Sequence, residues 1–170
     1  QVTNLPWKNN KDFLELKEKH KTPLLLAAYC AVLKDPLTGE GFNVDLASSG
    51  MKGLLLKAND TFSMNSSLGP YSKSKGYKEG ASYSNGQVVM TEGGGACKIA
   101  TITYNLAVLS DLEIVERYNH SMPINYVPYG QDATVFYGVK DFKFKTTSED
   151  NILIWAEMID NRLYMAFYGS

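Results

Sequence analysis

Gly93-Gly94-Gly95-Ala96-Cys97 leads directly into Lys98-Ile99-Ala100-Thr101-Ile102-Thr103-Tyr104-Asn105-Leu106-Ala107-Val108-Leu109. Within this run Ile99, Ile102, Leu106 and Leu109 recur at intervals of three and four, as on the buried stripe of an amphipathic helix. The glycines favour a tight turn before it. The sequence therefore predicts a core helix that begins at about Cys97 and ends near Ser110.

Cys97 is expected at the N-terminus of this helix, where a thiol becomes reactive. The unpaired N–H groups and the helix dipole there favour an anion and lower a thiol pKa from about 8.5 to about 3.5–7.5. The same N–H groups can stabilise the oxyanion that forms when a carbonyl is attacked. We expect the backbone around Gly95, Ala96 and Lys98 to supply these groups.

The remaining patterns predict strands and turns more than further long helices. Residues 24–33 form an apolar run typical of a buried strand, and residues 112–118 are rich in β-branched side chains. Residues 133–137 and 141–145 indicate two strands joined near Gly138, and residues 152–168 a hairpin that turns at Asp160-Asn161. The fold class is therefore α+β, a single domain with the cysteine-bearing helix packed on a mostly antiparallel sheet.

Composition excludes several classes of function. The 170 residues carry a net charge of −1 and a pI of about 6.2, so there is no basic surface for nucleic acid. Cys30, Cys97, His20 and His120 match no metal-binding spacing, and we expect neither a metal nor another cofactor. A disulfide between the two cysteines stays open.

Helix and strand lengths suggest a partner for the thiol. A helix from Cys97 to about Ser110 and a strand from Leu112 to about Tyr118 are each roughly 20 Å long. If the chain turns back between them, His120 arrives beside Cys97. An imidazole there can accept the thiol proton and later return a proton to a leaving amine.

A third group usually fixes the tautomer of such an imidazole. Asp132, at the start of a predicted strand, is the first choice, ahead of Asp141 and Asn119. Arg117 lies on the opposite face of its strand from His120, so it could reach a substrate carboxylate only through a bulge.

Simpler interpretations of the same residues stay open. A free cysteine is commonly buried, a histidine is more often structural, and Asp132 can be a turn or cap residue. The three glycines can also serve a close approach between helix and strand. They lack the Gly-Lys-Ser/Thr continuation of a phosphate loop, which argues against nucleotide binding.

Beyond the glycine–cysteine run, further short motifs follow in order through residues 24–145. They are Phe42-Asn43-Val44, Leu46-Ala47, Thr61-Phe62-Ser63-Met64-Asn65, Gly69-Pro70, Gly76-Tyr77, Ala81, Tyr104-Asn105, Glu116-Arg117, His120-Ser121, Tyr126-Val127-Pro128, Asp132-Ala133-Thr134-Val135, Tyr137-Gly138 and Asp141-Phe142. Together they resemble the VanW-type domain, a family of the bacterial cell envelope. Lys98 departs from the family pattern, which usually has glutamine after the cysteine.

The resemblance implies an L,D-transpeptidase that forms 3–3 cross-links in peptidoglycan. Cys97 would be the nucleophile, His120 the base and acid, and Asp132 the orienting group. The partners would be a donor tetrapeptide stem and the amine of an acceptor stem. Arg117, Thr101 and Tyr126 are candidates for substrate binding.

The same resemblance implies an extracytoplasmic domain of a longer, anchored protein. We expect residues 24–170 to form the catalytic domain, as a monomer, and residues 1–23 to be an N-terminal extension packed on it. The apolar run at residues 23–33 is too short to cross a bilayer.

Two other functions remain as alternatives. A cysteine peptidase or carboxypeptidase would pass the acyl group to water and trim stem peptides. A non-catalytic module would bind peptidoglycan or a glycopeptide, and a buried or disulfide-bonded Cys97 would favour it.

Overall fold

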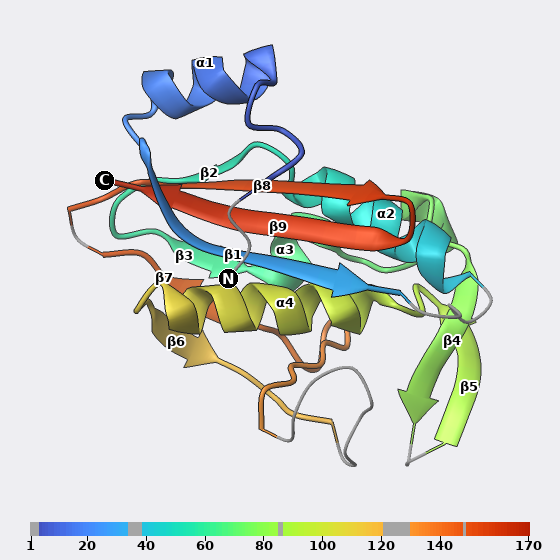
Figure 1. The fold of residues 1–170 in the computed structure, drawn as a ribbon. Helices are drawn as coiled ribbons and strands as arrows, with labels where there is room; N and C mark the ends of the chain where they lie inside the picture. Colours follow the sequence, from blue (N-terminus) through green and yellow to red (C-terminus); the bar gives the residue numbers. More distant parts are fainter. Residues whose placement is uncertain (1–3, 34–38, 85–86, 121–129, 148) are drawn as a thin grey trace.

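The centre of the fold is a four-stranded antiparallel sheet in the order β1-β9-β8-β2. The computed structural model describes residues 4–33, 39–84, 87–120, 130–147 and 149–170 (Figure 1). The sheet consists of β1 (Leu24–Val32), β2 (Leu54–Leu56), β8 (Ile152–Ile159) and β9 (Arg162–Gly169). Strands from both ends of the sequence therefore pair with the C-terminal hairpin.

The other elements surround this sheet. The helices are α1 (Lys11–Lys19), α2 (Glu40–Met51), α3 (Met64–Leu68), α4 (Ala96–Leu109) and the short 3-10 turn η1 (Lys73–Lys75). A three-stranded antiparallel sheet contains β3 (Thr61–Ser63), β7 (Lys143–Lys145) and β6 (Glu113–Glu116), and a separate hairpin contains β4 (Glu79–Ser84) and β5 (Gln87–Glu92). The predicted α+β class and the predicted core helix are confirmed.

The central strands are buried on both faces because α1 covers one face and α4 the other (Figure 1). Side chains of a strand alternate between faces. In β8, Leu153 and Trp155 belong to the small cluster under α1, while Ile152 and Ile154 belong to the main core. A strand covered in this way has no solvent face, which explains its continuous apolar sequence.

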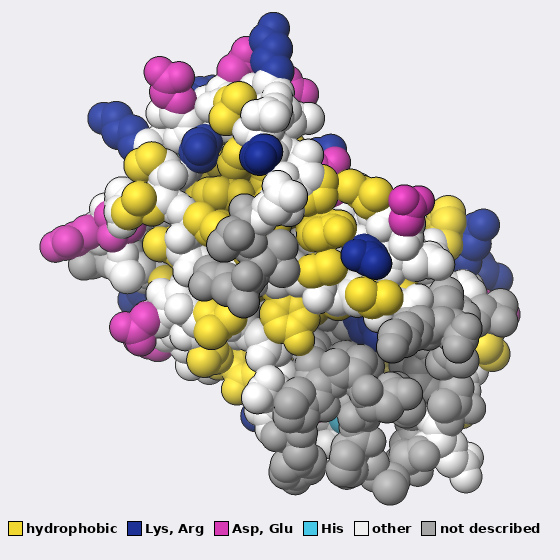
Figure 2. Space-filling view, in the orientation of Figure 1, with side chains coloured by type: hydrophobic (Ala, Val, Ile, Leu, Met, Phe, Trp, Pro, Cys, Tyr) yellow, Lys and Arg dark blue, Asp and Glu magenta, His cyan; other side chains and the backbone are white. Residues whose placement is uncertain are grey.

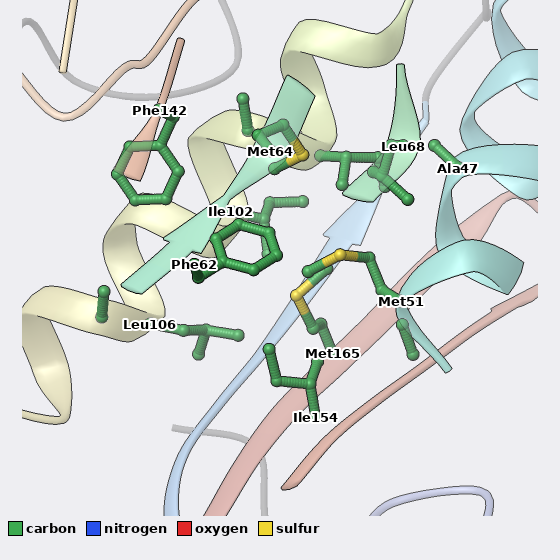
Figure 3. Close-up of a cluster of buried hydrophobic side chains, with 14 of the residues drawn as sticks. Ala47, Met51, Phe62, Met64, Leu68, Ile102, Leu106, Phe142, Ile154 and Met165 are labelled. Carbon is green, nitrogen blue, oxygen red and sulfur yellow. The ribbon is translucent and has the colours of Figure 1, made fainter. Parts of the chain in front are cut away.

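The main core lies between this sheet, the helices α2 and α4, and the elements that follow α2. Figure 3 shows Met51 of α2, Phe62 of β3 and Met64 of α3 converging with Ile102 of α4 and Met165 of β9. All five side chains are at most 2% exposed. Dense burial of this kind fixes α4, whose buried residues extend from Ala96 to Ala107.

The C-terminal hairpin has the predicted turn. Ile159 pairs with Arg162, so Asp160 and Asn161 form a two-residue loop, and both have positive φ, 49° and 61°. These are the angles of a type I′ turn, whose twist matches the twist of paired strands. Asn and Asp tolerate them better than other non-glycine residues do.

The N-terminal segment packs on the outer face of the central sheet. The side chain of Asn10 caps α1 by accepting a hydrogen bond from the Phe13 N–H. The Trp7 indole donates to the Tyr168 hydroxyl at 2.9 Å, and the Phe13 ring lies 5.3 Å from that of Trp155 and 4.9 Å from that of Tyr168. Charged side chains of both signs gather over α1, at the top of Figure 2.

Two expectations about strands need correction. β1 is an edge strand, and most of its residues are half-buried or exposed, because one side of it has no neighbour in the sheet. Residues 133–137 form no regular strand, and only an isolated bridge joins Phe136 to Lys140.

The β4–β5 hairpin was not predicted from the sequence. No helix among the described residues has the length and apolar character needed to span a bilayer.

Phe13→Ala tests whether α1 is part of the folded unit. The ring is 2% exposed, so its removal should lower the free energy of unfolding by about 3–4 kcal/mol. Leu14→Ala is the matched control on the same helix, because Leu14 is 41% exposed and should cost less than about 1 kcal/mol. Urea denaturation followed by tryptophan fluorescence measures both. Equal, small losses would show that residues 1–23 do not belong to the cooperative unit.

Candidate active site

The glycine run before α4 is a point of close contact between three segments. A Cβ on Gly94 would lie 2.1 Å from the Gly80 carbonyl oxygen, and one on Gly93 would lie 2.5 Å from Tyr71 Cβ. A Cβ on Gly95 would approach the Glu40 side chain to 3.1 Å, and the φ of Gly95 is 104°. The glycines therefore allow β4, Tyr71 and the start of α2 to press against the entry to α4.

Polar contacts fix the same junction. The Asn43 amide donates to the carbonyls of Gly94 and Lys78, each at 2.9 Å, and accepts from the Lys78 N–H at 2.9 Å. The Lys98 ammonium lies 3.3 Å from the carboxylate of Glu40, the first residue of α2. The first turn of α4 is thus tied to α2. Cys97 is the second residue of α4, and it is free and half-buried.

One face of α4 binds the extended segment 131–135. Going down the helix, the Cys97 sulfur lies 3.2 Å from the Thr134 hydroxyl and 3.8 Å from the Val135 carbonyl oxygen. Four residues later, the buried Thr101 hydroxyl donates to the Ala133 carbonyl and accepts from the Ala133 N–H, both at 2.9 Å. Four residues after Thr101, the Asn105 amide donates to the Gln131 carbonyl at 2.8 Å.

His120 is held by Asp132. The carboxylate oxygen Oδ2 of Asp132 lies 2.7 Å from the imidazole Nδ1 and accepts the His120 backbone N–H at 2.6 Å. A ring nitrogen facing a carboxylate carries its proton, so Nδ1 donates to Asp132 and Nε2 is left for the sulfur. Both side chains are largely buried, at 8% and 7% exposure.

Arg117 supports Asp132 from the other side. Its Nε donates to the Asp132 carbonyl at 2.9 Å, and Nη2 donates to the carbonyls of Asp132 and Gly130 at 2.6 and 3.0 Å. The guanidinium also lies 3.7 Å from Asp132 Oδ1 and 4.7 Å from the centre of the Tyr104 ring. A bulge between Ile114 and Glu116 precedes it. This geometry does not support Arg117 as a ligand of a substrate carboxylate.

The pKa shifts follow from these contacts. Burial raises the pKa of the Cys97 thiol, but hydrogen bonds with His120, Thr134 and the Val135 backbone, with the charge of His120, outweigh burial and lower it. Burial lowers the pKa of His120, but hydrogen bonds and charges of Cys97 and Asp132 raise it overall. Burial raises the pKa of Asp132, and its bonds with His120 turn the net shift downward. All three directions favour a thiolate beside an imidazolium that rests on a carboxylate.

The predicted oxyanion donors are partly engaged elsewhere. The backbone N–H of Ala96 donates to the Gly93 carbonyl at 3.1 Å, and that of Lys98 donates to the Gly95 carbonyl at 3.0 Å. Among the described residues, the N–H groups of Gly95 and Cys97 meet no acceptor. The N–H groups of Ala96 and Lys98 are therefore occupied, and those of Gly95 and Cys97 have no acceptor among the described residues.

The other candidates are not at the reacting group. Thr101 is fully buried, and its hydroxyl bonds to both the carbonyl and the N–H of Ala133, which does not support a contact with substrate. Asp141 accepts from the Ser63 hydroxyl at 2.5 Å and the Asn65 N–H at 2.9 Å. Cys30 lies in β1 and is free, so no disulfide forms. Tyr126 lies outside the described residues.

Thr134 is a site residue that sequence reasoning missed. A signal for it was present, because side chains two apart on an extended segment share a face, and Thr134 stands two residues after Asp132. Tyr71 also lies near the sulfur. Its hydroxyl donates to Asn65 Oδ1 at 2.8 Å, and burial together with the charges of Tyr77, Asp141 and Cys97 raises its pKa.

Comparisons with known proteins converge on one family. The family model described as VanW like protein matches residues 39–168. The chain is 30% identical over 151 residues to the uncharacterized protein YoaR of Bacillus subtilis, covering 89% of the chain and 50% of that protein. It is 28% identical over 127 residues to the vancomycin B-type resistance protein VanW of Enterococcus faecalis, covering 72% of the chain and 46% of that protein. The chain thus spans about half the length of these relatives. No solved structure matches it significantly.

The lowered pKa of Cys97 predicts that this thiol is alkylated at a lower pH than an ordinary thiol. In a Cys30→Ser background, the iodoacetamide rate should reach half its plateau below the pH of an ordinary thiol, about 8.5. His120→Gln removes the hydrogen bond and the positive charge, so the midpoint should rise. His20→Gln is the matched control and should leave it unchanged. An unreactive Cys97, or identical midpoints in the two histidine variants, would contradict the thiolate–imidazolium arrangement.

Thr101→Val should destabilise the protein by about 2–4 kcal/mol. Valine keeps the shape but leaves the buried N–H and C=O of Ala133 without partners. Thr101→Ser keeps the hydroxyl and should lose less than half as much. Thr61 in β3 is exposed, so Thr61→Val is the control, and its free energy of unfolding should stay within about 0.5 kcal/mol of the wild type. Urea denaturation measures these stabilities. Equal stabilities for the valine and serine variants would show that the Thr101 hydroxyl does not stabilise the backbone of Ala133.

Proposed function

This chain belongs to the family of VanW like proteins, and we propose that it is a cysteine acyltransferase that forms 3–3 cross-links between peptidoglycan stem peptides. One observation carries the proposal. The Cys97 thiol and the His120 imidazole form a hydrogen-bonded pair, and Asp132 holds the imidazole at 2.7 Å. Nucleophile, base and orienting group in this order are the arrangement of cysteine acyl transfer.

The family relationship supports the substrate class. One relative is a vancomycin B-type resistance protein, which connects the family with the bacterial cell wall. The free and half-buried state of Cys97 does not favour the alternative of a non-catalytic binding module. The proposal also places the domain outside the cytoplasm, where its substrate lies.

In the first step the thiolate attacks the carbonyl carbon of the third stem residue. A C–S bond forms, and the carbonyl oxygen becomes an oxyanion that the N–H groups of Cys97 and Gly95 can stabilise. The C–N bond to the terminal D-alanine then breaks. The imidazolium of His120 gives its proton to the leaving amine, and a thioester on Cys97 remains.

In the second step the amine of an acceptor stem attacks the thioester. His120, now neutral, accepts a proton from this amine, and the C–S bond breaks as the amide forms. The thiolate and the imidazolium are restored together. Asp132 stays ionised throughout and stabilises the imidazolium whenever it is present.

Mass spectrometry of the intact protein with a purified stem tetrapeptide tests the proposal. The wild type should gain the mass of a tripeptide acyl group, and dimeric stems should appear in solution. Cys97→Ala should lower their formation by about 10³-fold or more, because it removes the atom that carries the acyl group. A carbapenem should label the wild type but not this variant.

Cys30→Ala is the matched control and should retain both adduct and product. Trimmed stems without dimers would identify a hydrolase that uses the same thioester. Undiminished turnover in Cys97→Ala, with its fold intact by circular dichroism, would disprove the proposal.

A further inference from the structure

Thr134 contacts the sulfur of the nucleophile directly. Its hydroxyl oxygen lies 3.2 Å from Cys97 Sγ. The residue itself is fixed by its backbone, because its N–H donates to the Tyr118 carbonyl at 2.8 Å. On its N-terminal side Ala133 is bound through both backbone groups to Thr101. The hydroxyl is therefore presented to the sulfur from a held backbone.

The chemistry of the two groups sets the direction of this hydrogen bond. A thiolate has no proton and can only accept, so the hydroxyl must be the donor whenever Cys97 is ionised. When Cys97 is protonated, its S–H has another acceptor in the Val135 carbonyl at 3.8 Å. Among the described residues the Thr134 hydroxyl meets no acceptor besides this sulfur. In the thiolate state its proton therefore points at Sγ.

We propose that Thr134 is a further catalytic residue of this site, which donates a hydrogen bond to the Cys97 sulfur and stabilises it as a thiolate. Catalysis by this residue rests on the proposed function, whereas the donation itself does not. Hydrogen bonds to an ionised acceptor are stronger than those to a neutral one. The contact therefore favours the charged sulfur over the neutral thiol and over the thioester.

This preference acts at two points of the reaction. Before acylation it increases the fraction of Cys97 that is thiolate. When the acceptor amine displaces the thioester, it stabilises the sulfur that leaves. No proton is transferred from Thr134, and no bond to its oxygen forms or breaks, so the residue ends each cycle unchanged.

Other charged groups around the sulfur also affect the ionisation of Cys97. His120 faces it with Asp132 and Arg117 behind, and Lys98, in the first turn of α4, pairs with Glu40 of α2. The charge of Cys97 also reaches the hydroxyl of Tyr71. The Thr134 variants leave all these groups in place, so a change in thiol ionisation can be assigned to the hydroxyl.

The experiment is the pH profile of Cys97 alkylation by iodoacetamide, in a Cys30→Ser background. Thr134→Val removes the donor and should raise the midpoint by about one pH unit, the size of one charge-assisted hydrogen bond. The plateau rate at high pH should not fall, because a thiolate of higher pKa is intrinsically more nucleophilic. Thr134→Ser keeps a hydroxyl and should restore most of the wild-type midpoint.

Two further variants make the result decisive. Thr134→Ala also removes the donor without adding bulk beside the sulfur, so it replaces the valine variant if that one does not fold. Thr61→Val makes the same change on exposed β3 and should leave the midpoint as in the wild type. A wild-type midpoint in Thr134→Val or Thr134→Ala, or equal midpoints in the serine and alanine variants, would overturn the proposal.

The same variants separate this proposal from the proposed function. If Cys97 forms no thioester with a stem tetrapeptide but the midpoint rises without the hydroxyl, the donation stands and the acyltransferase does not. If dimeric stems form equally fast in the wild type and in Thr134→Val at pH values below the midpoint, Thr134 has no catalytic role.

Discussion

The alignment of α4 with the extended segment 131–135 is the constraint on which the candidate site depends. Four residues of an α-helix rise about 6.0 Å, and two residues of an extended chain advance about 6.6 Å. Cys97, Thr101 and Asn105 can therefore meet residues 134–135, 133 and 131 in succession. This match places Asp132 and Thr134 on the side of the segment that faces the imidazole and the sulfur. The hydrophobic core fixes the same helix, so the core and the site share one rigid element.

Much of this arrangement could be predicted from the sequence, because it rests on local periodicity. The helical stripe and the turn at Asp160-Asn161 are local signals. The turn appears as predicted, and Ile99, Ile102 and Leu106 are buried, whereas Leu109, the last residue of the predicted stripe, is 61% exposed at the end of α4. The pairing of Cys97 with His120 rested on element lengths, and those tolerate small errors in the ends of a strand. β6 ends at Glu116, yet the imidazole still reaches the sulfur.

The rest depended on contacts between segments far apart in the chain, which no local pattern encodes. For the glycine run, the sequence left open both N–H groups that stabilise an oxyanion and a close approach between segments, and the structure shows Gly94 and Gly95 packed against Gly80 and Glu40. Arg117 and Thr101 have the chemistry of substrate ligands, but each is occupied by the backbone of residues 130–133. The edge position of β1 was equally hidden, because an apolar run does not reveal how many neighbours its strand has.

The position of the β8–β9 hairpin also has a consequence for biosynthesis. These two strands follow every other described element of this domain in the sequence, yet they lie at the centre of the main sheet, where β9 pairs with β1 and β8 with β2. A nascent chain emerges from its N-terminus, so β1 and β2 have no partners, and α4 has no central sheet to pack on, until β8 and β9 appear. Folding must therefore wait for the completed domain. Until then the domain lacks its tertiary fold, which is the state in which a polypeptide can pass through a narrow channel.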